Sequence, residues 1–252
     1  IGNQYYYEHN YELAIKNYQY SAKLDNPFAL DTLGYIYTNG LGVPKDHLRA
    51  LFYFEKSASF GNSNALNNIG CLYYFGNGVT QSYSDAKKYF ELAADKGSSL
   101  ALINIATLYK RGYGVAQDYS IVKRCYERLA QQNNSIGFLK LGNLYRRGKG
   151  VIQDYSKAKL YYELSSLQNN PQALFHMSEF YSIGEFFETD YSKAIYYLNK
   201  CIQQNNSLSL NKYYYRAHND IALIYITVFE DIEKALNYIK IAAFSEYPFG
   251  QN

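Results

Sequence analysis

Four glycine-rich turns are the stretches of this 252-residue chain whose residue types and spacing most invite a chemical role. They read GLGV (40–43), GNGV (76–79), GYGV (112–115) and GKGV (148–151). A glycine loop before a helix can bind phosphate through backbone N–H groups, but a Walker loop requires GxxxxGK[ST] after a strand. Here the preceding segment is helical, and Leu, Asn or Tyr replaces the lysine of GKGV in the other turns. We therefore predict that these turns are joints between helices.

The histidines and cysteines are too scattered for a metal or nucleophile motif. They are His9, His47, His176, His218, Cys71, Cys125 and Cys201. No HExxH pattern occurs, and no serine or cysteine has a recognisable base nearby in the sequence. We therefore expect no enzyme activity, no cofactor and no metal site. The odd number of separated cysteines argues against a disulfide framework and favours a reducing compartment such as the cytoplasm.

The charge balance and hydropathy exclude two further classes. Lys plus Arg is 25 and Asp plus Glu is 22, which gives a net charge of +3. A nucleic-acid binder usually has a strong basic stripe or a pI above about 9. The longest apolar run, Ile221–Phe229, is shorter than the roughly 18 to 20 residues that span a bilayer. We expect neither a nucleic-acid partner nor a membrane span in this segment.

The turns recur every 36 residues, and a regular period of this length indicates a repeat array. In the unit that begins at Ala101, apolar residues follow helical spacing before Gly112 and again after Asp118, which is placed to cap a second helix. Small residues recur where the two helices would approach most closely, at Gly34, Gly70, Ala106, Gly142 and Ser178. Each unit is thus predicted to be a helix hairpin that buries its apolar face by stacking on its neighbours.

These units resemble the Sel1-like repeat, a 36-residue antiparallel helix pair. The match is carried in the fourth unit by Gly137, Leu141, Gly142, Tyr145, Gly148, Gly150, Val151, Asp154, Lys157, Ala158, Tyr161 and Tyr162. The resemblance implies an all-α fold, a right-handed α-solenoid of stacked antiparallel helix pairs. It predicts five repeats over 29–208, with boundaries 29–64, 65–100, 101–136, 137–172 and 173–208, the last with a degenerate turn at 183–189. Residues 1–28 and 209–252 resemble tetratricopeptide repeats, and the C-terminal one follows an insertion within 205–216.

The resemblance also implies a function, because the first helices of such units line a concave groove that holds other proteins. We expect aromatic anchors in this groove at Tyr6, Tyr7, Tyr35, Tyr74 and Phe75. Some tetratricopeptide grooves bind a C-terminal carboxylate with Asn, Lys and Arg, and a similar basic patch is predicted from Lys110, Arg111, Asn143, Arg146 and Arg147. The chain is then a non-catalytic scaffold or adaptor for a protein or peptide segment with acidic groups. The alternative for the basic residues is solvated charge that pairs with the helix dipole.

Two other functions remain open at this point. The chain could be a structural subunit whose edges or convex face are buried in a larger assembly. It could also be the repeat region of a larger endoplasmic-reticulum quality-control adaptor or signalling protein, in which case the lumen replaces the cytoplasm as its compartment. The sequence does not decide between these functions, and it does not determine the oligomeric state.

Overall fold

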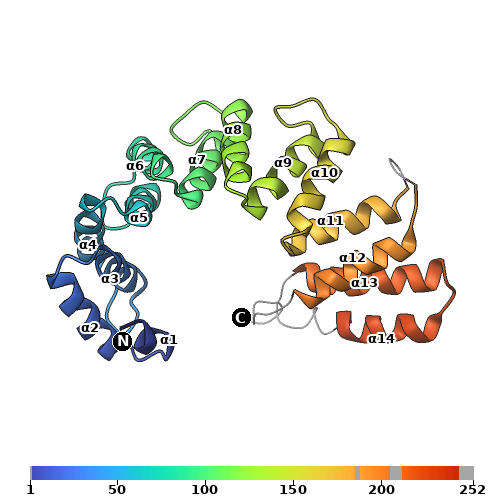
Figure 1. The fold of residues 1–252 in the computed structure, drawn as a ribbon, viewed down its shortest axis with the longest axis horizontal. Helices are drawn as coiled ribbons and strands as arrows, with labels where there is room; N and C mark the ends of the chain where they lie inside the picture. Colours follow the sequence, from blue (N-terminus) through green and yellow to red (C-terminus); the bar gives the residue numbers. More distant parts are fainter. Residues whose placement is uncertain (1, 185–187, 205–211, 244–252) are drawn as a thin grey trace. The chain divides into compact units, whose positions relative to one another are not determined.

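The computed structural model describes residues 2–184, 188–204 and 212–243, and these residues form fourteen α-helices and no strand (Figure 1). The fifth predicted turn includes 185–187 and the predicted insertion includes 205–211, so those parts of the two predictions lie outside the described residues. The chain divides into unit 1, residues 1–125, and unit 2, residues 126–252. In chain order the helices are α1 (Gly2–Tyr7), α2 (Tyr11–Lys23), α3 (Pro27–Asn39), α4 (His47–Ser59), α5 (Ser63–Phe75), α6 (Tyr83–Asp95), α7 (Ser99–Arg111), α8 (Tyr119–Gln131), α9 (Ser135–Arg147), α10 (Tyr155–Ser166), α11 (Pro171–Ser182), α12 (Tyr191–Gln203), α13 (Lys212–Thr227) and α14 (Ile232–Ala243).

Consecutive helices form stacked pairs. We call the first, odd-numbered helix of each pair the A helix and the second the B helix. In unit 1, α3 packs on α4 and α5 on α6, and each B helix also packs on the next A helix. In Figure 1, α3, α5 and α7 follow one another in one row and α4 and α6 in another. Unit 2 repeats the arrangement in the pairs α9–α10, α11–α12 and α13–α14. The predicted all-α solenoid of helix pairs is confirmed.

The glycine turns are joints, as predicted. Gly112 ends α7 in the left-handed region with a φ of 70°, which a residue without a Cβ adopts at low cost. Across the turn, Asp118 caps α8, since its Oδ1 accepts hydrogen bonds from the backbone N–H groups of Ser120 (2.7 Å) and Ile121 (3.3 Å). Gln117 donates from Nε2 to the carbonyl of Lys110 at 2.7 Å, and Gln81 and Gln153 make the same bond in their own turns. These bonds satisfy carbonyl groups that an α-helix leaves unpaired at its C-terminus.

Small residues allow the A and B helices to approach, as the recurring glycines predicted. A Cβ added at Gly34 would lie 2.5 Å from the ring of Phe54, and one at Gly142 would lie 2.7 Å from the ring of Tyr162. Real Cβ atoms do not approach other heavy atoms this closely. The rings of Phe54 and Tyr162 therefore occupy the space that these two glycines leave open.

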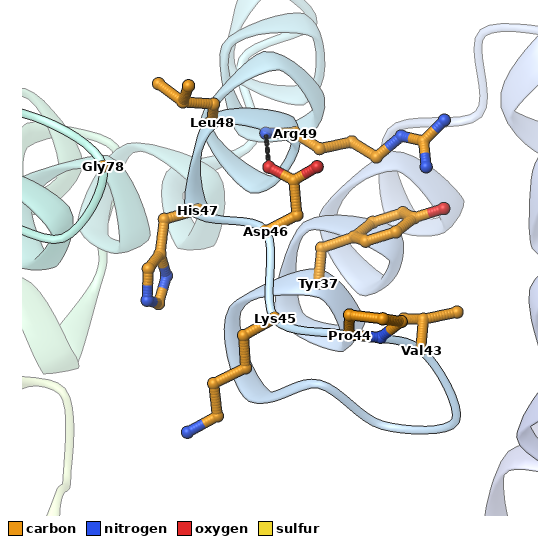
Figure 2. A pocket seen from close by; sticks show the side chains of 9 residues that line it. All are labelled: Tyr37, Val43, Pro44, Lys45, Asp46, His47, Leu48, Arg49 and Gly78. Atoms are coloured by element: carbon orange, nitrogen blue, oxygen red, sulfur yellow. Dashed lines mark hydrogen bonds between the residues drawn. The ribbon is translucent and has the colours of Figure 1, made fainter.

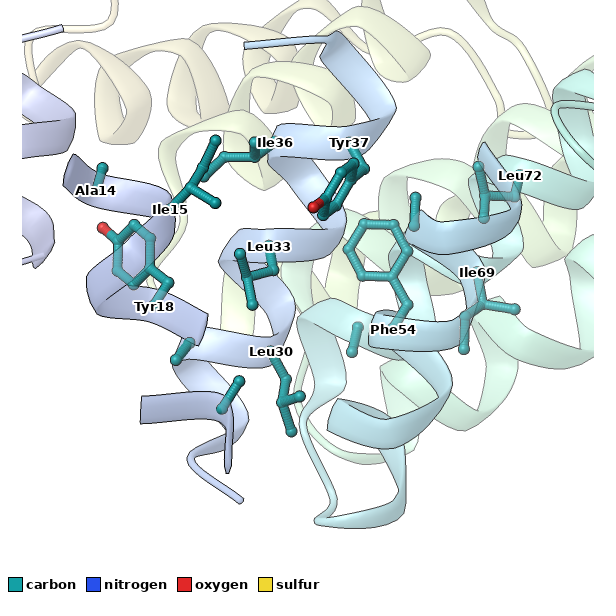
Figure 3. Close-up of a cluster of buried hydrophobic side chains, with 14 residues drawn as sticks. Ala14, Ile15, Tyr18, Leu30, Leu33, Ile36, Tyr37, Phe54, Ile69 and Leu72 are labelled. Atoms are coloured by element: carbon teal, nitrogen blue, oxygen red, sulfur yellow. The ribbon is translucent and has the colours of Figure 1, made fainter. Parts of the chain in front are cut away.

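The core of unit 1 runs along the seam between the two rows of helices. Leu33 of α3, Phe54 of α4 and Ile69 of α5 are almost completely buried and lie side by side (Figure 3). Tyrosines at the end of the A helices pack on tyrosines of the B helices, with ring centroids between 5.5 and 6.0 Å apart. These stacked pairs are Tyr37–Tyr53, Tyr73–Tyr89, Tyr145–Tyr161, Tyr181–Tyr197 and Tyr225–Tyr238. Packing therefore accounts for these tyrosines.

Candidate partner-binding surface

One face of the A helices in unit 1 carries both polar and apolar side chains that are not part of the core. Its members recur at helical spacings of three and four, and we call them the A-helix face. They are Phe28, Asp31, Thr32 and Tyr35 on α3, Asn64, Asn67, Asn68, Cys71 and Phe75 on α5, and Leu100, Asn104, Thr107 and Arg111 on α7.

Polar side chains join neighbouring A helices across this face. Asn68 donates from Nδ2 to Oδ1 of Asp31 at 3.1 Å, and Asn104 donates from Nδ2 to Oδ1 of Asn67 at 2.9 Å. Asn104 also lies 3.8 Å from the sulfur of Cys71. The residues of each hydrogen-bonded pair are 37 positions apart, which is one repeat plus one residue. These bonds fix the register of α3, α5 and α7.

Three of the predicted anchors meet in one pocket. Tyr6 and Tyr7 of α1 and Tyr35 of α3 line a cavity of about 180 Å³, which we call the aromatic pocket. Its other lining residues are Asn3, Tyr18, Phe28, Asp31 and Thr32. The rings of Tyr6 and Tyr7 meet edge to face at 5.9 Å, and the side chain of Tyr7 is 78% exposed.

The chain folds this pocket from three helices. Tyr18 of α2 supports the floor, because its hydroxyl donates to Oδ1 of Asn3 at 2.8 Å while its ring is buried. Burial raises the pKa of the Tyr18 phenol, and the neighbouring Tyr6 and Tyr7 add to that rise. Burial likewise raises the pKa of Tyr6, with Tyr35 as the next cause. The raised pKa values keep the phenols of Tyr6 and Tyr18 neutral at physiological pH.

Asp31 is the one ionisable carboxyl group in the lining of the aromatic pocket. Burial raises its pKa from 3.8 to about 6, and the hydrogen bond from Asn68 offsets only part of the rise. At neutral pH the carboxylate is mostly ionised but poorly solvated. A cation placed next to such a carboxylate stabilises its ionised form.

The other predicted residues of unit 1 gather at the turn between α7 and α8 and at the end of α5. The rings of Tyr74 and Phe75 meet at 4.9 Å, and Tyr74 lies 6.1 Å from Tyr113. The guanidinium of Arg111 lies 5.7 Å from the centre of the Tyr113 ring and donates to its hydroxyl at 3.3 Å. Lys110 is exposed beside Arg111. The structure thus brings Tyr74, Phe75 and Arg111 into a second aromatic cluster, separate from the aromatic pocket.

The predicted basic residues of unit 2 have different environments. Arg146 forms an ion pair with Glu179, and Nδ1 of His176 lies 2.8 Å from the same carboxylate oxygen. Burial raises the pKa of Glu179, but the hydrogen bond from His176 and the charge of Arg146 outweigh it and leave that pKa lowered. Asn143 accepts a hydrogen bond from the hydroxyl of Tyr162 at 2.9 Å.

Arg146 is consequently neutralised within the fold, whereas Arg147 is exposed. This internal pairing weakens the sequence argument that counted Arg146 as a groove cation. Lys110 and Arg111 belong to unit 1 and Asn143, Arg146 and Arg147 to unit 2. A single basic patch made from both sets remains a prediction.

A larger pocket, of about 490 Å³, lies on the turn between α3 and α4 (Figure 2). Asp46 lies in its lining, but its carboxylate caps α4 by accepting from the backbone N–H of Arg49 at 2.9 Å. Nδ1 of His47 is buried, and no described residue forms a hydrogen bond with it. A Cβ added at Gly78, in the next turn, would lie 2.7 Å from the Cβ of His47. This pocket lies between consecutive turns, and its one carboxylate, Asp46, serves to cap α4.

The cysteines and histidines gather into no metal site in the described part of the chain. None of the three described cysteines forms a disulfide, and Cys125 and Cys201 are buried. Burial raises the pKa of Cys71 to about 11 and that of Cys201 to about 12. Across the described ranges, no three His, Cys, Asp or Glu side chains come together as a metal site. Of the helices described, none combines the length and apolar character that crossing a lipid bilayer requires.

The sequence analysis missed the residues that complete the aromatic pocket, chiefly Asp31 and Phe28. A signal for them was present, because both precede Tyr35 by helical spacings of four and seven and so share its face. The contacts of Asn68 and Asn104 were also predictable, because each partner lies 37 residues earlier and so at a nearly equivalent position of the preceding repeat.

Comparisons with known proteins agree with this architecture. The Sel1 repeat model matches seven stretches, residues 2–26, 28–62, 63–98, 99–134, 139–170, 171–206 and 226–243. A Sel1 repeat protein from Oxalobacter formigenes superposes with a TM-score of 0.80 at 26% identity, over 97% of this chain and 98% of that one. A search of curated proteins finds no match.

Two further solved structures are similar. The protein c5321, a protective antigen present in uropathogenic Escherichia coli strains with an SLR fold, has a TM-score of 0.74 and 26% identity over 93% of this chain. This chain spans only half, 50%, of the length of c5321. The immunity protein PA5088 from Pseudomonas aeruginosa shares the fold, with a TM-score of 0.57 at 20% identity over 83% of this chain and 84% of that one. With repeat matches along most of its length, the chain belongs to the Sel1 repeat family.

Proposed function

We propose that the chain is a non-catalytic scaffold that binds an extended protein segment along the A-helix face of unit 1. Sel1 repeat proteins generally act as protein-interaction scaffolds, and the fold is that of the family. The observation that carries the proposal is the composition of this face. Phe28, Phe75 and Leu100 are each more than half exposed there, beside amide side chains such as Asn64. Exposed aromatic side chains can anchor a peptide, while amides can pair with its backbone.

Acidic groups on the partner are part of this proposal. Lys110 and Arg111 are exposed at the end of α7, and Arg147 is exposed at the end of α9. In the proposal the cations of each unit separately attract carboxylates of the partner, and in unit 2 Asn143 adds hydrogen bonds. Arg146 has a structural role instead, since Glu179 already neutralises it.

Selection of peptides from a random display library tests the scaffold, with the full chain immobilised. Enriched peptides are then measured against Phe75→Ala, on the A-helix face, and against Phe52→Ala, on the B helix α4. The two phenylalanines are matched controls because their exposures are similar, 64% and 60%. We expect binding to weaken roughly tenfold or more with Phe75→Ala, which is the loss expected of an interface anchor, and to stay within about twofold with Phe52→Ala. The reverse pattern, or no peptide sensitive to Phe75, would contradict the proposal.

Charge reversal tests the acidic partner separately. Arg111→Glu and Arg147→Glu are compared with Arg124→Glu, an exposed arginine of the B helix α8. The first two variants should bind acidic peptides more weakly, and this binding should depend less on salt. The control variant should show neither change. If all three variants bind equally, the scaffold stands without its acidic partner.

A structural subunit is the second candidate, and one observation favours it. The C-terminal helix pair exposes large apolar side chains, with Leu223 of α13 at 58% and Ile232 and Leu236 of α14 at 65% and 48%. Large exposed apolar side chains can mark a protein interface where they gather into a patch. Native mass spectrometry of the complex isolated from the source cell tests it. Loss of a stoichiometric partner in the double variant Ile232→Lys with Leu236→Lys would support the role of structural subunit. If the partner still binds the double variant, this surface is not the interface.

A further inference from the structure

We propose that the aromatic pocket of unit 1 binds the cationic side chain of a lysine or arginine in the partner segment. The inference rests on the proposed function and specifies the chemistry of one of its contacts. It begins from the lining of the pocket, in which rings and one carboxylate surround a single small cavity.

The rings supply the first half of the recognition. Tyr6 and Tyr7 come from α1, Tyr18 from α2, and Phe28 and Tyr35 from α3. Aromatic faces carry negative electrostatic potential and attract ammonium and guanidinium groups within about 6 Å of the ring centre. Tyr7, Phe28 and Tyr35 are 78%, 57% and 47% exposed, so an incoming side chain can reach the rings.

The carboxylate supplies the second half. Oδ1 of Asp31 accepts only from the neutral amide of Asn68, and no donor within the described residues reaches its Oδ2. Asp25 of the same unit differs, because it pairs with Lys56 at 2.7 Å. No lysine or arginine is among the residues that line the aromatic pocket. Asp31 is thus a poorly solvated anion whose counter-charge the described residues do not provide.

The size of the cavity selects a side chain over a larger ligand. Its volume of about 180 Å³ is below the roughly 300–1,000 Å³ of sites for drug-sized molecules. An acidic side chain would be repelled by Asp31. A purely apolar side chain would cover the ionised carboxylate without pairing it, which is unfavourable. An aliphatic stem that ends in a cation satisfies both the rings and the carboxylate.

Titration of the isotope-labelled full chain with blocked tripeptides tests the proposal by NMR. The probes are acetyl-Gly-Lys-Gly-amide, acetyl-Gly-norleucine-Gly-amide and acetyl-Gly-Glu-Gly-amide, which share a backbone and differ in the side-chain tip. We expect the lysine peptide to shift the ring signals of Tyr6, Tyr7 and Tyr35 and to bind roughly tenfold or more tightly than the norleucine peptide, since the cation alone distinguishes them. The glutamate peptide should shift none of these signals.

Asp31→Asn provides the decisive variant, with Glu55→Gln on α4 as the control because it removes an exposed carboxylate from the same unit. Asp31→Asn should erase the preference for lysine over norleucine, and Glu55→Gln should retain it. Equal binding of lysine and norleucine by the parent chain, or an unchanged preference in Asp31→Asn, would overturn the inference.

The outcomes separate this inference from the proposed function. Display peptides that depend on Phe75 but lack basic residues would leave the scaffold standing and refute the cation site. Binding of the lysine peptide at the pocket, without any display peptide that depends on the A-helix face, would support the site and refute the scaffold.

Discussion

Replacing Asp31 by asparagine should make the chain more stable at pH 8. The change keeps the shape of the side chain and its hydrogen bond to Asn68, but it removes a charge that burial disfavours. A residue that lowers stability in the absence of a ligand is expected at a binding site, where stability and function compete.

The structure gives the size and the sign of this effect. Burial raises the pKa of Asp31 from 3.8 to about 6, and at about 1.36 kcal/mol per pKa unit the ionised form costs about 3 kcal/mol of folding free energy. Below about pH 3.8 the group is protonated in both states and costs nothing. Between about 3.8 and 6 the folded chain holds a proton that the unfolded chain has lost, so stability falls as the pH rises. Above about pH 6 the full cost persists.

The groups that face Asp31 are phenols and a neutral amide. The pocket presents the phenols of Tyr6, Tyr7, Tyr18 and Tyr35 from α1, α2 and α3, and α5 presents the neutral amide of Asn68. Phenols ionise near pH 10, far above the range in which Asp31 changes charge. The pH dependence of the difference between parent and variant therefore reports on Asp31.

Urea unfolding of the parent chain, Asp31→Asn and Glu55→Gln at several pH values between 3.5 and 8 measures the effect, with hydrogen exchange on α3 and α5 as a local readout. Asp31→Asn should match the parent near pH 3.5 and gain up to about 3 kcal/mol by pH 8, while Glu55→Gln stays within about 0.5 kcal/mol of it at each pH. A difference that is the same at both ends of the pH range would refute the reasoning, as would a variant less stable than the parent at pH 8.

Three further predictions concern packing, charge and reactivity. Gly142→Ala should destabilise unit 2 by about 2 kcal/mol, because its Cβ would lie 2.7 Å from the ring of Tyr162; thermal unfolding measures this, and an unchanged Tm would contradict the close approach. Arg146→Ala should cost about 2 kcal/mol at pH 7, because Glu179 loses its arginine partner and keeps only the contact with His176. Since the pKa of Glu179 is lowered in the fold, that contribution should be lost as the pH falls below about 4.5, and a double-mutant cycle with Glu179→Gln in urea tests it. Burial raises the pKa of Cys71 to about 11, so iodoacetamide at pH 8 should modify it on the order of a hundredfold more slowly than an unfolded thiol, and rapid modification would show that the thiol is accessible.

Much of the architecture follows from the sequence because each repeat is built from local rules. The turn GYGV ends a helix because Gly112 takes a positive φ, and Asp118 begins the next helix by capping it. Gly34 and Gly142 marked the close approach of paired helices because the same small residue recurs at the same place in the period. Such features depend on a few neighbouring residues and on one period, and both are readable without coordinates.

The candidate surface can be predicted from the sequence only in part, because it is formed by side chains from different repeats. Tyr6, Tyr7 and Tyr35 were predicted as anchors from their helix faces, but their meeting with Asp31 in one cavity required the packing of α1 on α2 and of α2 on α3. The periodic pattern also suggested that Arg146 is a free cation.

The sequence by itself determined the repeat, the helix pairs, the joints and the family, since periodic local interactions encode all four. Only the tertiary structure decided which charges remain available. Arg146 forms an ion pair with Glu179 of the next repeat, whereas Asp31 meets only the neutral amide of Asn68 from the next repeat. The free energy of a charge depends on burial and on the neighbours within a few ångströms, and those neighbours are set by how the repeats stack.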